Sequence, residues 1–398
     1  MNAQLKEIKK EVREVLLQNI MPFWSGKMID QTNGGFYGRI DGNNQLHPTA
    51  DKGGILNARI LWTFSSAYLQ EKNPLYLEMA NRAKAYILAH FFDPEFGGTY
   101  WKLSFDGKPV DTKKQIYSQA FFIYAFTEHY RASGDELSLN TAIELFHMIE
   151  KYSFDPKMNG YFEAYSRDWV LLEDLRLSEK DENEKKTMNT HLHILEAYTN
   201  LYRVWKDDRL ETQLRNLILI FTDKIVNQTT NHLNLFFDEN WNTKSVIVSY
   251  GHDIEASWLI DEAARVLGDK VLLVKIQKIC IAIAIAACDG LQPDGSLYYE
   301  MDKAIGHLDK DRHWWVQAEG VLGFLNAWEL SRDDAWLVKA QNCWNYISDN
   351  IIDRTGGEWF WSISDAGLPI LSGDKAGFWK CPYHNSRMCL EIMMRVEE

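Results

Sequence analysis

The chain has 398 residues, of which 46% are hydrophobic and 25% are charged, a composition typical of a globular protein. Its formal net charge of −13 argues against nucleic-acid binding, which needs a basic face, and against binding to an anionic membrane surface. A neutral or cationic small molecule is the partner that this charge accommodates best.

The N-terminal segment MNAQLKEIKKEVREVLLQNI predicts an amphipathic helix with charges throughout and without the apolar core of a signal peptide. The five cysteines lie in the second half of the chain and include no C-x-x-C pair, which favours a reduced, cytoplasmic protein. The most apolar run, residues 279–288, is about half as long as a membrane span. We therefore expect it to be a helix buried on all sides.

Aromatic-rich turn segments recur along the chain at a nearly constant interval. Their anchor positions are Gly35, Gly98, Gly160, Leu233, Gly295 and Gly357, with spacings of 63, 62, 73, 62 and 62 residues. The long interval contains SEKDENEKK (178–186), a charged insert of nine residues that we interpret as a solvated loop. Each segment alternates aromatic residues between turn signals, which predicts a short hairpin.

Between these segments the apolar residues recur at helical spacing. Five such stretches cover residues 55–70, 116–133, 188–205, 250–268 and 314–331, and a second helical stretch follows each of them, for example 75–92. Repeated helix pairs predict an all-α fold, an (α/α)6 barrel, with residues 1–398 as one catalytic domain. We expect the first helix of each pair to line the inner wall and the hairpin loops to rim a central cleft.

The stretch SYGHDIEASWL (249–259) places ionisable residues in an otherwise apolar helix. His252, Glu255 and Trp258 share one helical face, whereas Asp253 points elsewhere. Three interpretations fit this spacing: half of a metal site, a structural hydrogen bond, or a catalytic histidine oriented by a carboxylate. The helix offers no further ligand of the H-E-x-x-H type, which disfavours the metal.

Two other stretches contain candidate histidines. In FWKCPYHNSRM (378–388), His384 follows aromatic residues at the expected start of the last helix. In MNTHLHILEAY (188–198), His191 and His193 are two residues apart and cannot share one face of a helix. We expect His193 to face inward with Asn189 and Glu196, and we regard zinc binding by H-x-H as a weak possibility.

Further candidates combine an arginine with aromatic residues. Arg59, in KGGILNARILWTFS (52–65), lies on an apolar helical face, where a buried guanidinium needs either a structural carboxylate or an oxyanion formed in catalysis. Trp314 and Trp315 precede Glu319, and Tyr117 is a further inward candidate. Together these residues predict an acid/base pocket with aromatic walls, of the kind that holds a sugar ring.

Several of these strings are specific to one family. KGGILNARILWTFS, MNTHLHILEAYTNLYR, SYGHDIEASWL, WWVQAE and WKCPYHNSRMCLEI resemble the cellobiose 2-epimerases, within the N-acylglucosamine 2-epimerase superfamily, and the resemblance spans essentially the full chain. Ser386 departs from the family pattern, which has glycine there. The resemblance implies an (α/α)6 barrel that epimerises C2 of the reducing-end sugar of β-1,4-linked disaccharides, such as cellobiose, lactose or mannobiose, through a cis-enediol intermediate without cofactor or metal.

The resemblance also implies roles for individual residues. His252 and His384 correspond to the acid/base pair, Glu255 to the residue that orients His252, and Arg59 and His193 to the groups that stabilise the enediolate. The residues that it implies for sugar binding are Tyr117, Asn189, Trp258, Trp314, Trp315, Glu319 and Trp379.

Four alternatives remain open at this point. An aldose–ketose isomerase and an N-acylglucosamine or monosaccharide 2-epimerase would share the fold. A glycoside hydrolase would use carboxylates such as Asp253, Glu255 and Glu319, and a non-catalytic sugar-binding protein would not need paired histidines. We expect a monomer or a weak homo-oligomer whose only ligand is the disaccharide.

Overall fold

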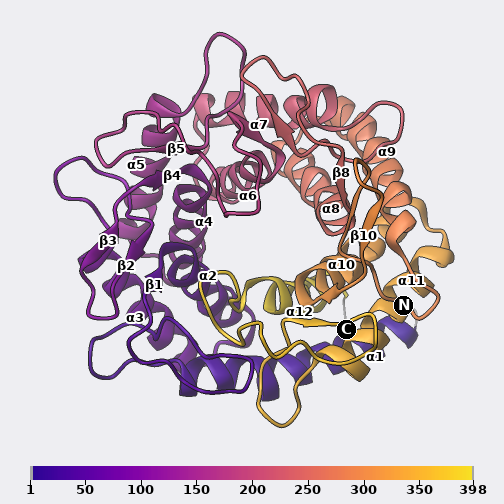
Figure 1. Ribbon diagram of the computed structural model, residues 1–398, viewed down its shortest axis with the longest axis horizontal. Coiled ribbons are helices and arrows are strands. Elements are labelled where there is room, and N and C mark those ends of the chain that lie inside the picture. Colours follow the sequence, from indigo (N-terminus) through magenta and orange to yellow (C-terminus); the bar gives the residue numbers. More distant parts are fainter. Residues whose placement is uncertain (1–2, 397–398) are drawn as a thin grey trace.

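The inner wall of the molecule is a ring of helices whose apolar and small residues are buried on nearly all sides. The computed structural model describes residues 3–396, and Figure 1 shows two concentric rings of helices in it. The inner helices are α2 (Gly54–Glu71), α4 (Ile116–Ser133), α6 (Met188–Val204), α8 (Tyr250–Leu267), α10 (Trp314–Ser331) and α12 (Tyr383–Arg395). The outer helices are α1 (Ala3–Val15), α3 (Pro74–His90), α5 (Glu136–Tyr152), α7 (Asp208–Ile220), α9 (Lys270–Ala287) and α11 (Asp334–Tyr346). The predicted (α/α)6 barrel is therefore confirmed.

Each outer helix after the first follows its inner partner through a tight corner. Lys72, Gly134, Gly268 and Arg332 take a left-handed backbone conformation directly after α2, α4, α8 and α10, a geometry that ends a helix sharply. The next residue, or Asp207 two residues after the extended Trp205 that ends α6, then caps the outer helix, because its side chain accepts a hydrogen bond from the first exposed N–H groups. These capping residues are Asn73, Asp135, Asp207, Asp269 and Asp333.

Short strands link consecutive units at the other end of the barrel. The strand before each inner helix pairs with the strand after its outer partner, as in β4 (Lys114–Gln115) with β5 (Ala164–Tyr165). The remaining strands are β1 (Lys52–Gly53), β2 (Lys102–Leu103), β3 (Pro109–Asp111), β6 (Lys186–Thr187), β7 (Phe236–Phe237), β8 (Ile247–Ser249), β9 (Glu300–Asp302), β10 (His307–Asp309), β11 (Arg312–His313) and β12 (Ser362–Ile363). Short helical turns complete the chain at η1 (Leu16–Ile20), η2 (Phe23–Lys27), η3 (Phe221–Ile225), η4 (Cys288–Gly290) and η5 (Ile347–Ile351).

Buried lysine–aspartate ion pairs tie the strands to the preceding turn segment. Lys114 Nζ lies 3.0 Å from Asp93 Oδ2, and both side chains are fully shielded from solvent. The pairs Lys52–Asp30 and Lys186–Asp155 repeat this contact at 2.8 Å in neighbouring units. Lys186 was expected in a solvated insert, so that expectation is wrong for the end of the insert, where β6 begins.

The apolar run 279–288 lies in α9, which packs against α8 in the outer ring. Ile285, within this run, is 57% exposed, so the expectation of burial on all sides is wrong. By length and composition alone the stretch Lys270–Gly290 could cross a membrane, with one third of it buried inside the molecule. A single such helix is weak evidence for a membrane span, because core helices of soluble proteins have the same length and composition.

Candidate active site

The candidate residues meet at the N-terminal end of the inner ring. All but two of them lie in the first two turns of the six inner helices, whereas Trp258 lies one turn further along α8 and Trp379 lies in the segment before α12. A cavity of about 200 Å³ lies among them. Ten of the twelve predicted residues line it: Arg59, Tyr117, Asn189, His193, His252, Glu255, Trp314, Trp315, Trp379 and His384. A smaller cavity of about 90 Å³ adjoins it and shares Asn189 and His252.

Three histidines in this cavity have the same arrangement. Nδ1 of His193 lies 3.0 Å from Glu196 Oε2, Nδ1 of His252 lies 2.8 Å from Ser249 Oγ, and Nδ1 of His384 lies 2.7 Å from Glu319 Oε1. No described residue hydrogen-bonds to Nε2 of any of the three. Each ring is therefore held by one nitrogen and presents the other to the cavity, which is how a general acid or base is positioned.

The partner of His252 differs from the expected one. The sequence predicted that Glu255 orients His252, but Nδ1 of His252 shares its hydrogen bond with Oγ of Ser249, three residues earlier, at the N-cap of α8. Glu255 instead accepts a hydrogen bond of 2.6 Å from Arg387 Nη2. The expected role of Glu255 toward His252 is therefore wrong. Burial and the charges of His193 and Lys180 lower the pKa of His252 to about 3, so its imidazole is neutral in the empty site.

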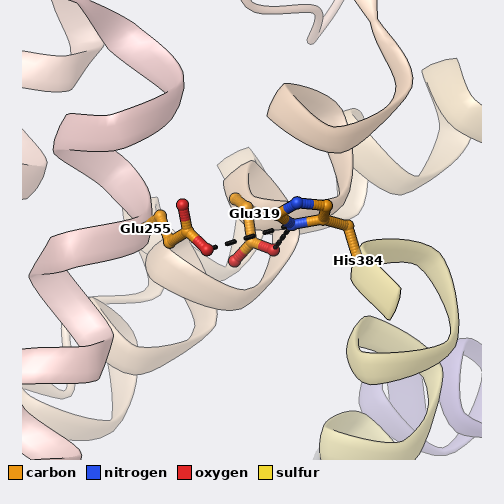
Figure 2. Close-up of side chains that lie close together, drawn as sticks. All are labelled: Glu255, Glu319 and His384. Carbon is orange, nitrogen blue, oxygen red and sulfur yellow. Dashed lines mark hydrogen bonds and ion pairs between the residues drawn. The ribbon is translucent and has the colours of Figure 1, made fainter. Parts of the chain in front are cut away.

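Glu255, Glu319 and His384 form a compact cluster (Figure 2), in which Glu255 and His384 line the cavity and Glu319 lies behind its wall. Nδ1 of His384 lies 2.7 Å from Glu319 Oε1 and 3.9 Å from Glu255 Oε1. Arg387 Nη2 donates to both carboxylates at 2.6 Å. Burial, followed by the negative charge of Glu319, raises the pKa of Glu255 to about 8. At neutral pH the cluster therefore keeps a proton on one of its carboxyl groups.

The same cluster has the composition of a metal site, since its ligand atoms lie within 4.8 Å of one another. A cation already occupies the position between the two carboxylates, however, because the guanidinium of Arg387 contacts both of them. Arg387 is fully buried and cannot leave without exposing several buried charges. The donor set therefore suits this guanidinium rather than a metal ion.

Two predicted sugar-binding residues lie behind the cavity wall. Trp258 is 1% exposed and donates its indole N–H to Glu319 Oε2 at 3.0 Å. Glu319 is fully buried and serves as the acceptor for His384. Neither side chain lines the cavity, so the expectation that they hold the sugar rings is wrong. They instead support His384 from behind.

Arg59 is a buried cation that has no carboxylate partner among residues 3–396. Its guanidinium donates to Tyr117 Oη at 2.8 Å and to Cys381 Sγ at 3.4 Å, and it lies over the rings of Phe121 and Tyr383. Burial lowers the pKa of Arg59, but Tyr117, Cys381 and Tyr383 raise it by more, so the pKa stays above its usual value. Because buried arginines are normally paired, this charge is suited to an anion that forms in the cavity.

His191 and His193 have different surroundings, as their spacing predicted. Nε2 of His191 accepts a hydrogen bond from the backbone N–H of Tyr161 at 3.0 Å, and its Nδ1 lies 2.7 Å from Thr187 O. Both ring nitrogens are thus used within the fold. His193 lines the cavity and has a partner at Nδ1 alone among the described residues. His191 is structural, and His193 is available for chemistry.

Helix termini add to the positive potential of the site. The N-terminal ends of the inner helices surround the cavity, and each carries a partial positive charge from its unpaired N–H groups. This local field runs counter to the net charge of −13 for the whole chain. The site is therefore suited to a neutral substrate that becomes anionic during the reaction.

Comparisons with known proteins agree with this geometry. Residues 35–386 match the model of the N-acylglucosamine 2-epimerase family. The chain belongs to this family. It is 55% identical to a cellobiose 2-epimerase of Bacteroides fragilis over 97% of this chain and 98% of that protein. It is 43% identical to a cellobiose 2-epimerase of Ruminococcus albus over 97% of this chain and 98% of that one.

Solved structures of N-acylglucosamine 2-epimerase family members and of more distant proteins share the fold. A cellobiose 2-epimerase of Bacillus thermoamylovorans, 42% identical, matches with a TM-score of 0.94 over 98% of this chain and 100% of that chain. A D-mannose isomerase, 17% identical, matches with a TM-score of 0.85 over 100% of both chains. At that identity the second match shows the fold alone.

In this member of the N-acylglucosamine 2-epimerase family, sequence reasoning missed several residues of the site. Ser249 and Arg387 were quoted within motifs but not singled out, although a serine at a helix start is an ordinary cap signal. Tyr299 and His313 also line the cavity and stack with a centroid distance of 4.0 Å. Lys180 comes from the charged insert and donates to Tyr299 Oη at 2.8 Å, so the insert reaches the cavity mouth.

Proposed function

We propose that this chain epimerises C2 of the reducing-end sugar of a β-1,4-linked disaccharide such as cellobiose. The observation that carries the proposal is the set of three imidazoles with an unpartnered Nε2 in one cavity, next to the unpaired guanidinium of Arg59. These groups provide what the reaction needs, namely bases for the C2 proton and a cation for the enediolate. The names of relatives at 55% and 43% identity support the same substrate class.

His252 and His384 are the groups that we assign to the C2 proton. In the open-chain sugar, the C1 aldehyde makes the C2 proton acidic, so a neutral imidazole Nε2 can remove it. The resulting enediolate is stabilised by Arg59 and by the helix N-termini. The second histidine then returns a proton to the opposite face of C2. This histidine takes its proton from solvent, so the reaction in D2O places deuterium at C2.

Aromatic side chains are suited to hold the two sugar rings. Tyr117, Trp314, Trp315 and Trp379 line the cavity, and such rings pack against the apolar faces of sugars. Trp315 lies between the acid/base residues, with ring centroids 4.8 Å from His252 and 5.5 Å from His384. Trp315 is therefore our candidate for the residue that stacks on the reacting sugar.

The proposed reaction needs no cofactor, since proton transfer uses side chains alone. A glycoside hydrolase is disfavoured because Glu255 and Glu319 are bridged by one guanidinium nitrogen, which leaves no space for the water that separates an inverting pair by roughly 6.5–9.5 Å. The five cysteines are free in the structure, which fits the cytoplasm. We expect a monomer or weak homo-oligomer.

Incubation with cellobiose in D2O, followed by NMR of the reducing-end sugar, tests the proposal. Deuterium at C2 together with glucosyl-mannose is the expected result. Deuterium at C1 with a ketose product would assign an isomerase instead, and free glucose would assign a hydrolase. Absence of any change with cellobiose, lactose and mannobiose would refute the proposal.

A further inference from the structure

The contacts of His193 fix which of its ring nitrogens carries a hydrogen. Nδ1 lies 3.0 Å from a carboxylate oxygen of Glu196, which also accepts from Tyr383 Oη and Arg387 Nη1. Burial raises the pKa of Glu196, but the charge of Arg387 and the hydrogen bond from His193 outweigh this effect and lower the pKa to about 2. An ionised carboxylate can only accept hydrogen bonds. Nδ1 therefore carries the hydrogen, and Nε2 has a free lone pair whenever the ring is neutral.

This tautomer is at odds with a simple role in enediolate stabilisation. A neutral His193 with hydrogen on Nδ1 cannot donate from Nε2 to a sugar oxygen. Burial lowers the pKa of His193 below its usual value, although the carboxylate of Glu196 opposes this shift, and the charges of Arg59 and Arg387 lower the pKa further. The ring is therefore neutral at neutral pH. In that state Nε2 can only accept a proton. This lone pair on Nε2 is suited to a step that removes a proton from the sugar before the chemistry at C2 begins.

Ring opening is such a step. The reducing-end sugar is a cyclic hemiacetal, and its C2 proton becomes acidic only after the C1 aldehyde has formed. We propose that His193 is the base that opens the sugar ring and that Glu196 is the residue that positions it. This inference rests on the proposed epimerase function and deepens it, since it assigns a separate pair of residues to the first chemical step.

The step balances with groups that line the cavity. Nε2 of His193 takes the proton of the O1 hydroxyl, the C1–O1 double bond forms, and the C1–O5 bond breaks with its electron pair going to O5. The carboxyl group of Glu255 gives its proton to O5. His193 is then an imidazolium whose Nε2–H can donate to O1, so it stabilises the enediolate only after it has acted as a base.

Each charge that this step creates has a partner already in place. The imidazolium of His193 faces the carboxylate of Glu196 at 3.0 Å. The carboxylate of Glu255 faces Arg387 Nη2 at 2.6 Å. Arg387 also contacts Glu196 through Nη1, so one guanidinium joins the carboxylate that positions His193 to the proton donor Glu255. No charge is left unpaired in the buried floor, where an isolated charge would be costly.

Two variants and one control test this assignment. In Glu196→Gln the carboxylate is lost, and in His193→Gln the base is lost while the carboxylate partners of Arg387 remain. Glu150→Gln is the matched control, because Glu150 is also buried and accepts hydrogen bonds from Tyr161 and Tyr198 but lies on the outer helix α5. The rate of anomer interconversion is followed by polarimetry from freshly dissolved β-cellobiose, and C2 exchange is compared for unlabelled and 2-deuterated cellobiose.

We expect both Glu196→Gln and His193→Gln to slow anomer interconversion by roughly 100-fold or more, the usual contribution of a general base. Ring opening then becomes the slow step, so the deuterium isotope effect on kcat/KM falls toward one. Glu150→Gln should retain both the rate and the isotope effect. A merely structural role of Glu196 would lower activity without changing the isotope effect.

Wild-type anomer interconversion in either site variant would overturn the assignment, and so would a loss of C2 exchange with an undiminished isotope effect. Because His193→Gln leaves Glu196 and Arg387 intact, it decides the question even if Glu196→Gln folds poorly, which thermal melting reveals. A wild-type protein that interconverts anomers but incorporates no deuterium at C2 would refute the proposed function and leave the ring-opening assignment standing.

Discussion

At the scale of single residues, the site is built from histidines that are each held by one nitrogen. Sequence spacing correctly suggested that His193 and His252 face inward, but it assigned the wrong partner to His252. Glu255 and Ser249 are both three residues away from His252, and spacing alone cannot separate them. The Cα–Cβ bonds of a helix tilt toward its N-terminus, so a histidine in the first turn reaches back to the cap residue. Helix direction therefore explains the choice of Ser249.

Replacement of either acid/base histidine tests the assignment of the C2 proton. We expect His252→Asn and His384→Asn each to reduce deuterium incorporation at C2 by roughly 100-fold or more, with little change in thermal stability. The measurement is NMR of cellobiose in D2O. His129→Asn is the control, since His129 is buried outside the cavity and should affect stability alone. Exchange near the wild-type rate in either site variant would contradict the two-histidine assignment.

Ser249→Ala tests the anchor of His252. Loss of one hydrogen bond costs about 0.5–1.5 kcal/mol, so we expect C2 exchange to fall by roughly tenfold while sugar affinity is preserved. The comparison of kcat and KM for cellobiose measures this difference. An unchanged kcat would show that packing against Trp315 is sufficient to hold the imidazole.

At the scale of elements, buried ion pairs hold the hairpin strands in place, because the strands are too short for their ladder hydrogen bonds to do so. β4 contains two residues, too few for a stable ladder by itself. Its Lys114 reaches Asp93 in the preceding turn segment, and Arg167 also donates to Asp93 at 2.8 Å and 2.9 Å. The sequence predicted the hairpins from their turn residues. It could not predict these pairs, because the partners are about twenty residues or more apart and belong to different strands and turns.

We expect Lys114→Met to destabilise the fold by about 3–5 kcal/mol, because it leaves the carboxylate of Asp93 buried without one of its partners. Urea unfolding measures the change. Lys108→Met, on an exposed side chain of the same hairpin region, should stay within about 0.5 kcal/mol. Equal effects of the two substitutions would show that the buried pair contributes nothing specific.

Because the buried ion pair of Lys114 and Asp93 needs an ionised carboxylate, we expect the protein to lose stability in acid. Burial raises the pKa of Asp93, but hydrogen bonds from Arg167 and Lys114 outweigh this effect and hold the pKa well below its usual value. A carboxyl with a lowered folded-state pKa contributes stability above its unfolded pKa of about 3.9 and loses it as the pH falls toward the folded pKa. We therefore expect Asp93→Asn to be less stable than wild type at pH 7 and to lose less stability between pH 5 and pH 2, as measured by thermal melting.

At the scale of the whole molecule, the repeat of turn segments predicted the barrel, and the site follows from its closure. Residues from different units, such as Arg59 on α2 and His384 on α12, meet because the inner helices form a ring (Figure 1). Periodicity indicates that these helices line one cavity. It does not indicate how each is rotated, and for that reason Trp258 and Glu319 were placed in the cavity although they lie behind its wall.

Close helix packing around the ring is a further test. Gly323 on α10 faces α8, and a methyl group there would lie 2.5 Å from the side chain of Ile254 and 2.6 Å from its carbonyl oxygen. We expect Gly323→Ala to cost about 1–3 kcal/mol and to slow C2 exchange, because α8 and α10 carry His252 and Trp315. Gly26→Ala, with no atom within 4 Å of the added carbon, is the control. Wild-type exchange in a destabilised Gly323→Ala protein would separate packing from catalysis.

The contact between α1 and α12 closes the ring where the earliest and latest parts of the chain meet. His384 and Arg387 lie on α12, so the buried floor of the site is incomplete until this helix has been made and has docked beside α1 and α2. Without α12, the carboxylates of Glu196, Glu255 and Glu319 on the other inner helices lack the cation that they share, Arg387. Closure of the ring by α12 therefore also completes the charge balance of the site.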